Sequence, residues 1–339
     1  MSTASPPRQA PIRPYGTFLS IIVAAFSIFF LLPRLQSWTT ITSDTNPQDL
    51  AKIQDSPTMA EPSSAQHRRT PVYFLGIGGP NFMENREHPA FRKLGETGRE
   101  ITTEVKPKAV VVFSAHWQDG PSRVSVNVAE DAGIIYDFYN FPPHYYEYKY
   151  PYKGSPEIAQ KVIDNLEGAG IEVQKVKRGL DHGVWVGFIA AFDPEKNPLN
   201  VPVVQVSLYG NEDPAKHYRL GQAVESLRDE GILIIGAGMA VHNLHDYRAT
   251  RGSGRTMPYA STFEEALTQA ITTTPEDRQK TMISLLGTSL ARQAHPSAEH
   301  ILPMYIAAGA AGSDTGERIW ALPEASLNWG QYRFGKPDA

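Results

Sequence analysis

From Pro71 onward the sequence repeats one pattern, in which short apolar runs alternate with longer stretches of mixed character. The short runs are rich in β-branched residues and are apolar at nearly every position, which is typical of strands buried on both faces. Strands that alternate with helices predict a sheet covered on both faces, and no second linker divides the region, so the sequence predicts one α/β domain. The predicted strands are Val72–Leu75, Ala109–Phe113, Val201–Leu208 and Gly231–Ile235, and the predicted helices include Ser155–Leu166, Pro214–Glu230 and Ser261–Thr273.

The first 70 residues lack this pattern. Their main feature is an uncharged apolar run, Phe18–Leu32, which approaches the length of a membrane-spanning helix when it is extended over 15–35. Arg8 and Arg13 precede the run and acidic residues follow it, which is the charge bias of a segment with a cytosolic N-terminus. Residues 36–70 are polar and contain several prolines, which is typical of a disordered linker.

These features predict a single-pass membrane protein that contacts the membrane through its N-terminal helix and carries its globular domain on the non-cytosolic side. Two alternatives stay open: a cleaved signal peptide, which would give a secreted protein, and a mitochondrial presequence. The predicted parts are a cytosolic tail over 1–14, a transmembrane signal-anchor helix over 15–35, a disordered linker over 36–70 and the globular domain over 71–339.

The chain contains no cysteine and ten histidines. The absence of cysteine excludes disulfides, thiolate metal sites and a thiol nucleophile. Imidazole therefore has to supply the nitrogen or sulfur ligands of any metal site. The formal net charge of −4 gives no electrostatic reason to expect a nucleic-acid partner. The sequence contains neither H-E-x-x-H nor G-x-S-x-G, which disfavours a zincin protease and an α/β-hydrolase.

Four histidines occupy positions that favour a functional site. His116 and His242 each follow an apolar strand, and ligands of open α/β sheets gather beyond the carboxyl ends of such strands. His182 lies in a predicted loop, and His300 lies near the start of a predicted helix that Ser297 could cap. Because imidazole is the commonest metal ligand, the four side chains together predict a metal site. Polar surroundings predict structural or surface roles for His67, His217 and His295, and leave His88, His144 and His245 open.

Seven short motifs follow one another along the predicted domain. The motifs are F-L-G-x-G-G-P (Phe74–Pro80), F-S-A-H-W (Phe113–Trp117), Y-D-F-Y-N-F-P (Tyr136–Pro142), Y-x-Y-K-G-S-P (Tyr150–Pro156), G-L-D-H-G-V-W (Gly179–Trp185), V-H-N-L (Val241–Leu244) and E-H-I-L-P (Glu299–Pro303). In this order they resemble the DOPA-type extradiol ring-cleavage dioxygenases of the class III superfamily, from about Pro71 to Gly335.

The resemblance implies a single domain with a central mixed sheet and one divalent ion per chain, Zn²⁺ or Fe²⁺. It implies that His116 and His300 are metal ligands and that His242 is a ligand or a base beside the metal. His182 would be the acid/base or the residue that orients the substrate. The implied reaction opens a catechol-type ring next to its diol, with O2 as the second substrate.

One position departs from the family pattern. The first glycine-rich loop of the family carries a histidine that serves as a metal ligand, and Ile77 stands in its place here. Isoleucine has no donor atom, so an alternative is a catalytically impaired homologue that binds an aromatic ligand without turnover. His88 could replace the missing ligand if the intervening loop folds back. A third reading is a metal-dependent hydrolase that uses the same histidines, although no carboxylate-rich ligand motif supports it.

Overall fold

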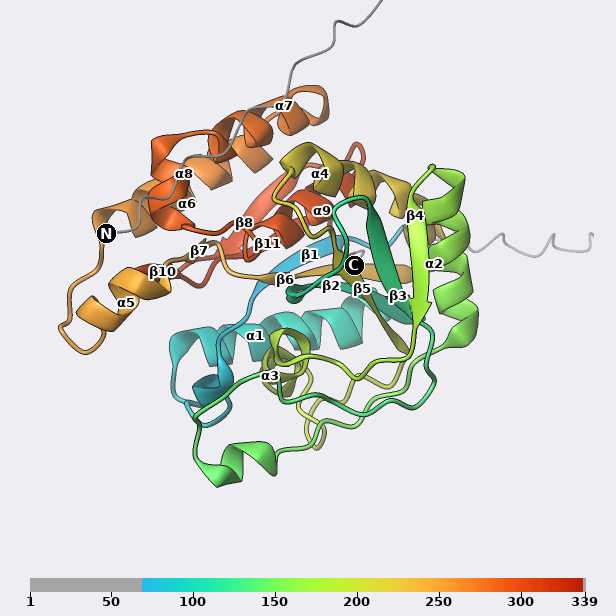
Figure 1. Ribbon diagram of the computed structural model, residues 1–339, viewed down its shortest axis with the longest axis horizontal. Coiled ribbons are helices and arrows are strands. Elements are labelled where there is room, and N and C mark those ends of the chain that lie inside the picture. Colours follow the sequence, from blue (N-terminus) through green and yellow to red (C-terminus); the bar gives the residue numbers. More distant parts are fainter. Residues whose placement is uncertain (1–68, 338–339) are drawn as a thin grey trace, which may run out of the picture. The chain divides into compact units, whose positions relative to one another are not determined.

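The predicted apolar runs form the centre of an eight-stranded mixed sheet in the computed structural model, which describes residues 69–337 (Figure 1). In sheet order the strands are β4 (Glu172–Val176), β3 (Arg123–Asn127), β5 (Val203–Leu208), β2 (Ala109–Gln118), β6 (Ile232–Gly238), β1 (Val72–Gly76), β11 (Gln331–Phe334) and β8 (Gly316–Trp320). The four strands β5, β2, β6 and β1 are parallel, so their carboxyl ends lie at one edge. β3 and β11 run antiparallel to their neighbours β5 and β1.

Successive side chains of the central strands face two separate cores, because a strand turns alternate residues to opposite faces. In β1, Val72 and Phe74 belong to one core, whereas Tyr73 and Leu75 belong to the other. Helices close both cores, which confirms the predicted α/β domain with a mixed sheet between helices (Figure 1). The first core is covered by α2 (Pro156–Gly168), α4 (Pro214–Ala223), α6 (Pro258–Ile271), α7 (Pro275–Leu286), α8 (Ser289–Ala294) and α9 (Leu302–Ala310), and the second by α1 (Pro89–Glu100) and α3 (His182–Ala191).

A smaller sheet lies beside the end of β6. Its order is β7 (Val241–His242), β10 (Leu327–Asn328) and β9 (Pro323–Glu324), and α5 (Leu244–Thr250) follows β7 directly. The smaller sheet therefore joins the segment of His242 to the C-terminal part of the described chain.

The sequence analysis did not predict helix α3. It placed His182, the first residue of this helix, in a loop. All ten of its residues are buried, so it has no polar face and its sequence lacks the periodicity of an amphipathic helix. Two other boundaries also differ from the prediction. The helix predicted over 214–230 ends at Ala223 and continues as a 3₁₀ helix over Glu225–Glu230, and β2 extends to Gln118.

The predicted tail over 1–14, span over 15–35 and nearly all of the linker over 36–70 lie outside the described residues. Within residues 69–337, no helix combines the length and the apolar composition that crossing a membrane requires. This finding contradicts the predicted single-pass membrane location, and nothing among the described residues supports the predicted membrane contact.

Candidate metal centre

The four histidines singled out in the sequence lie together at the edge formed by the carboxyl ends of the parallel strands. The ring centroids of His116 and His182 are 3.9 Å apart, those of His116 and His300 are 5.1 Å apart, and those of His242 and His300 are 3.5 Å apart. His116 belongs to the end of β2, and His182 is the first residue of α3. His242 ends β7, and His300 lies two residues before α9.

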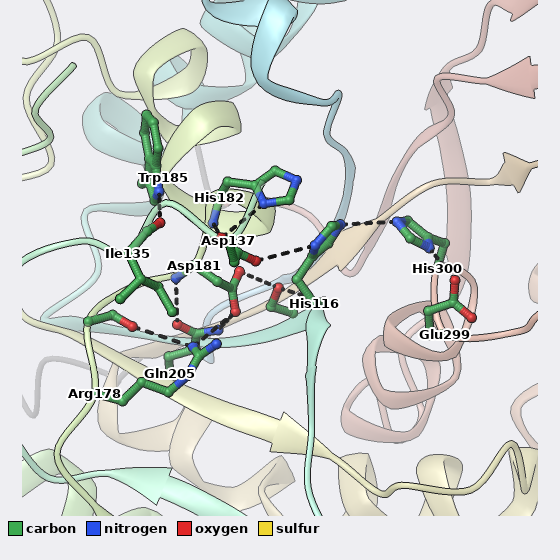
Figure 2. A network of polar contacts seen from close by, with 12 residues as sticks. His116, Ile135, Asp137, Arg178, Asp181, His182, Trp185, Gln205, Glu299 and His300 are labelled. Atoms are coloured by element: carbon green, nitrogen blue, oxygen red, sulfur yellow. Dashed lines mark hydrogen bonds and ion pairs between the residues drawn. The ribbon is translucent and has the colours of Figure 1, made fainter. Parts of the chain in front are cut away.

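A buried polar network fixes the end of β2 against the start of α3. The backbone N–H of His116 donates to Ser114 Oγ at 3.1 Å, and Ser114 Oγ donates to Asp181 Oδ1 at 2.7 Å. The other oxygen of Asp181 accepts from Gln205 Nε2 at 2.5 Å and from Arg178 Nη1 at 3.2 Å (Figure 2). Because Asp181 directly precedes His182, this network fixes the backbone of His116 and of His182 relative to each other.

Two glycines of β6 let the segment of His300 approach the sheet. A Cβ atom at Gly238 would lie 2.2 Å from the carbonyl oxygen of His300, and a Cβ atom at Gly236 would lie 2.4 Å from that of Pro303. The backbone N–H of Met239 donates to the same His300 carbonyl at 2.9 Å. The predicted cap of the following helix is wrong: Ser297 Oγ donates to Glu299 Oε1 at 3.0 Å, and α9 has no side-chain cap.

Asp137 is a site residue that the sequence analysis missed. Its Oδ1 accepts from the backbone N–H of His182 at 2.8 Å and lies 2.9 Å from Nδ1 of the same residue, off the direction of a well-aligned hydrogen bond. Its Oδ2 lies 3.4 Å from His116 Nδ1. Burial by itself would raise the pKa of Asp137, but the contacts with His116 and His182 outweigh it and hold the pKa well below its usual range.

His116 and His300 face each other through their Nε2 atoms, which are 3.2 Å apart (Figure 2). On its far side His300 places Nδ1 2.8 Å from Glu299 Oε1, just as His116 places Nδ1 beside Asp137. His242 stacks on His300 with 15° between the ring planes. Burial lowers the pKa of both His242 and His300, and the neighbouring imidazoles lower it further, so both rings are neutral at pH 7.

This donor set fits a divalent metal ion. When Nδ1–H of each ring points to its carboxylate, both Nε2 atoms present lone pairs to each other, and a shared cation removes that repulsion. Metal–nitrogen bonds of about 2.0–2.1 Å at a tetrahedral angle separate two ligand atoms by about 3.3 Å. The observed Nε2–Nε2 separation of 3.2 Å therefore suits two ligands of one ion. Imidazole accommodates both zinc and iron.

Ile77 is not part of this cluster of donors. Its side chain is 5% exposed and packs against Gly187 of α3, where an added Cβ atom would lie 2.2 Å from Ile77 Cγ2. His88 does not replace the missing ligand either. Its Nδ1 accepts from the backbone N–H of Ala90 at the start of α1, and its Nε2 lies 3.1 Å from Glu324 Oε2.

The other described histidines make contacts of their own outside the facing donors. His217 is buried, its Nδ1 lies 2.8 Å from the Asp213 carbonyl oxygen, and burial lowers its pKa to about 4. His295 is also buried, with Nε2 2.9 Å from the Ala240 carbonyl oxygen, so both are structural as predicted. His144 and His245 contact Glu84 and Asp246, and His67 lies outside the described residues.

Comparisons with known proteins agree on one family. A family model described as the catalytic LigB subunit of aromatic ring-opening dioxygenase matches residues 70–325. A 4,5-DOPA dioxygenase extradiol from Beta vulgaris is 37% identical over 268 residues, which cover 78% of this chain and 96% of the relative. The protein of the same name from Escherichia coli K12 is 32% identical over 244 residues, which cover 71% and 85%. A solved structure of an uncharacterized Escherichia coli K12 protein matches 79% of this chain and 100% of its own, with a TM-score of 0.64 and 28% identity.

Proposed function

The chain belongs to the family of the catalytic LigB subunit of aromatic ring-opening dioxygenases, and from this premise we propose that its histidine cluster is the site where a catechol-type ring is opened. The chain is accordingly a metal-dependent extradiol dioxygenase that acts on an aromatic substrate with O2. The observation that supports this site is the pair of facing Nε2 atoms of His116 and His300, each backed by a carboxylate at Nδ1.

In this proposal His116 and His300 hold the ion, which is Fe²⁺ or Zn²⁺, one per chain. His242, stacked on His300, is the third ligand or the base beside the ion. The chemistry that a bound ion supplies is Lewis acidity toward the two diol oxygens and, for Fe²⁺, electron transfer to O2. The neutral state of His242 and His300 suits this role, because only an unprotonated imidazole nitrogen can bind a metal.

His182 is proposed as the acid/base residue. Its ring lies edge-on to His116 with 70° between the planes, so it stands beside the proposed ligand rather than in line with it. Nδ1 faces Asp137, which leaves Nε2 to accept a proton from a substrate hydroxyl. His182 is also nearly buried, and a protected imidazole of this kind can take up and return a proton without competition from bulk water.

The substrate class follows from the relatives. Both relatives described above are named 4,5-DOPA dioxygenase extradiol, so we propose a catechol that carries a side chain, with DOPA as the first compound to test. An aromatic side chain near the cluster could stack on such a ring, but Trp185 is fully buried and donates from Nε1 to the Ile135 carbonyl oxygen, so it serves packing. Trp117 lies under the Arg178 guanidinium at 4.6 Å, and Tyr139 is 80% exposed.

The test is metal analysis of the purified chain together with oxygen uptake. We expect one equivalent of Fe²⁺ after anaerobic loading, O2 consumption with DOPA or catechol, and a semialdehyde product by absorbance and mass. His116→Ala and His300→Ala should each lose the metal and the activity, whereas His144→Ala, an exposed histidine paired with Glu84, should keep both. Full metal content in His116→Ala would show that the ion is held elsewhere. The impaired alternative predicts binding of the aromatic compound without oxygen uptake.

A further inference from the structure

Asp137 supplies a carboxylate to the N-terminus of α3 from a distant loop. The first backbone N–H groups of a helix have no partner within the helix and favour an anion. Asp181 is the N-cap residue of α3, but its side chain makes no capping hydrogen bond and is engaged by Ser114 and Gln205 instead. Instead, Asp137 Oδ1 accepts a hydrogen bond from the backbone N–H of His182 at 2.8 Å.

The fold fixes the backbone on both sides of this carboxylate. On one side of Asp137, Ile135 N–H donates to the Leu180 carbonyl at 2.8 Å, and the Ile135 carbonyl accepts from Trp185 Nε1 at 3.0 Å. On the other side, Phe138 is buried and its ring meets that of His182 edge-on, with centroids 5.6 Å apart. The segment of Asp137 is thus held by contacts of its neighbours with α3 and with Leu180.

The same carboxylate faces the Nδ1 atoms of two histidines, at 3.4 Å for His116 and 2.9 Å for His182. An ionised carboxylate only accepts hydrogen bonds, so it favours the tautomer with a proton on Nδ1 in both rings. In His116 this tautomer leaves the lone pair on Nε2, the atom that faces His300.

We propose that Asp137 is a positioning residue that sets the tautomer of His116 and the ring orientation of His182 together. This inference rests on the proposed roles of those two histidines. One carboxylate then links the residue that would hold the ion to the residue that would move the proton. A geometric alternative is that Asp137 is itself a ligand, because His116, Asp137 and His182 place their donor atoms within 4.8 Å of one another. That arrangement would use Nδ1 of His116 and place its proton on Nε2, so that the facing Nε2 pair would be a hydrogen bond from His116 to His300 instead of a pair of metal donors.

The first experiment uses the wild-type chain labelled with ¹⁵N-histidine. Its nitrogen shifts report the tautomer of each ring, and His116 is identified as the signal that is lost in His116→Ala. We expect the Nδ1–H tautomer for His116 without metal, and a shift at Nε2 when Zn²⁺ alone is added. An Nε2–H tautomer without metal, or a zinc-induced shift at Nδ1, would overturn the proposal. Both shifts are read on the wild-type chain, and His116→Ala serves only to assign the signal.

The second experiment compares Asp137→Asn with Asp131→Asn, a control whose carboxylate is exposed and paired with Lys153. In Asp137→Asn the side-chain amide can donate to Nδ1 of His116. This favours the tautomer with the proton on Nε2, which cannot bind the ion through that atom. We expect Zn²⁺ affinity, measured by competition with a chelator, to fall by roughly 10–100-fold, which is typical when the partner of a metal-bound histidine is removed. We expect kcat to fall with little change in KM, and Asp137→Glu to recover part of both losses. Asp131→Asn should match the wild type.

The outcomes separate this inference from the proposed function. If the wild type binds no metal and consumes no O2 with catechols, the proposed function fails. If the wild type does both and Asp137→Asn keeps its zinc affinity and its kcat, only the role of Asp137 is wrong. Loss of all zinc binding in both Asp137→Asn and Asp137→Glu would instead indicate that Asp137 is a ligand, and would overturn the positioning role.

Discussion

At the scale of single residues, Ile77 is the position where this chain departs most from its family pattern. It follows β1, at the same edge of the sheet as His116, and its backbone N–H donates to the Gly238 carbonyl at 2.8 Å. Its side chain fills the space beside Gly187 instead of offering a donor. A centre built on His116, His300 and His242 is therefore the arrangement that the proposed site allows.

We predict that Ile77→His raises Zn²⁺ affinity at least about tenfold, because it adds an imidazole at the position where the family pattern carries a metal ligand. Without metal the variant should unfold more easily, by about 1–3 kcal/mol, since a buried polar ring replaces an apolar side chain. Chelator competition and urea unfolding measure the two effects. Ile77→Val is the control, because it loosens the packing without adding a donor. Equal zinc affinities for Ile77→His, Ile77→Val and the wild type would mean that residue 77 does not face the centre.

The histidines of the site could be found from the sequence because each follows an apolar run or lies in a short family motif. Their carboxylate partners, Asp137 and Glu299, also lie in two of these motifs, but a motif does not show which imidazole an acid contacts. Asp137 reaches His182 across 45 positions of sequence, and no local spacing links an acid in one loop to the start of a later helix. Glu299 is adjacent to His300, but only the fold shows that its oxygen lies at Nδ1.

At the scale of elements, α3 decides where His182 lies, and it packs without a gap against α1. A Cβ atom at Gly98 of α1 would lie 1.7 Å from the carbonyl oxygen of Ala191, the last residue of α3. A Cβ atom at Gly95, one turn earlier, would lie 3.3 Å from the Ala190 carbonyl oxygen. The sequence predicted neither α3 nor this contact, because a helix that is apolar on all sides carries no amphipathic signal.

These distances predict different outcomes for two similar substitutions in one helix. Gly98→Ala should lower the free energy of unfolding by about 1–3 kcal/mol, because the methyl group meets backbone that cannot move aside. Gly95→Ala should stay within about 1 kcal/mol of the wild type, since the tight contact is offset by the better helix propensity of alanine. Urea unfolding of both variants checks the pair. Similar losses in the two variants would contradict the close packing of α1 on α3.

At the scale of the whole molecule, the candidate centre unites parts of the chain that are far apart in sequence. His116 and His300 are separated by 184 positions, and the parallel strands β2 and β6 bring their segments to the same edge of the sheet. Alternating strands and helices predicted this kind of sheet and the edge at which ligands gather. They could not predict the antiparallel strands β3 and β11 or the small sheet that includes β7, because those pairings depend on contacts between distant segments.

Because an unfolded chain does not keep these histidines together, metal binding should stabilise the whole domain. Ligand that binds only the folded state stabilises it by about 2.7 kcal/mol at a free concentration of 100 Kd. We predict a rise in unfolding free energy of this size for the wild type on addition of Zn²⁺, and its disappearance with a chelator. His116→Ala and His300→Ala should each lose the effect, whereas His245→Ala, an exposed histidine on α5, should retain it. A zinc effect that survives in His116→Ala would mean that the ion stabilises the fold from another place.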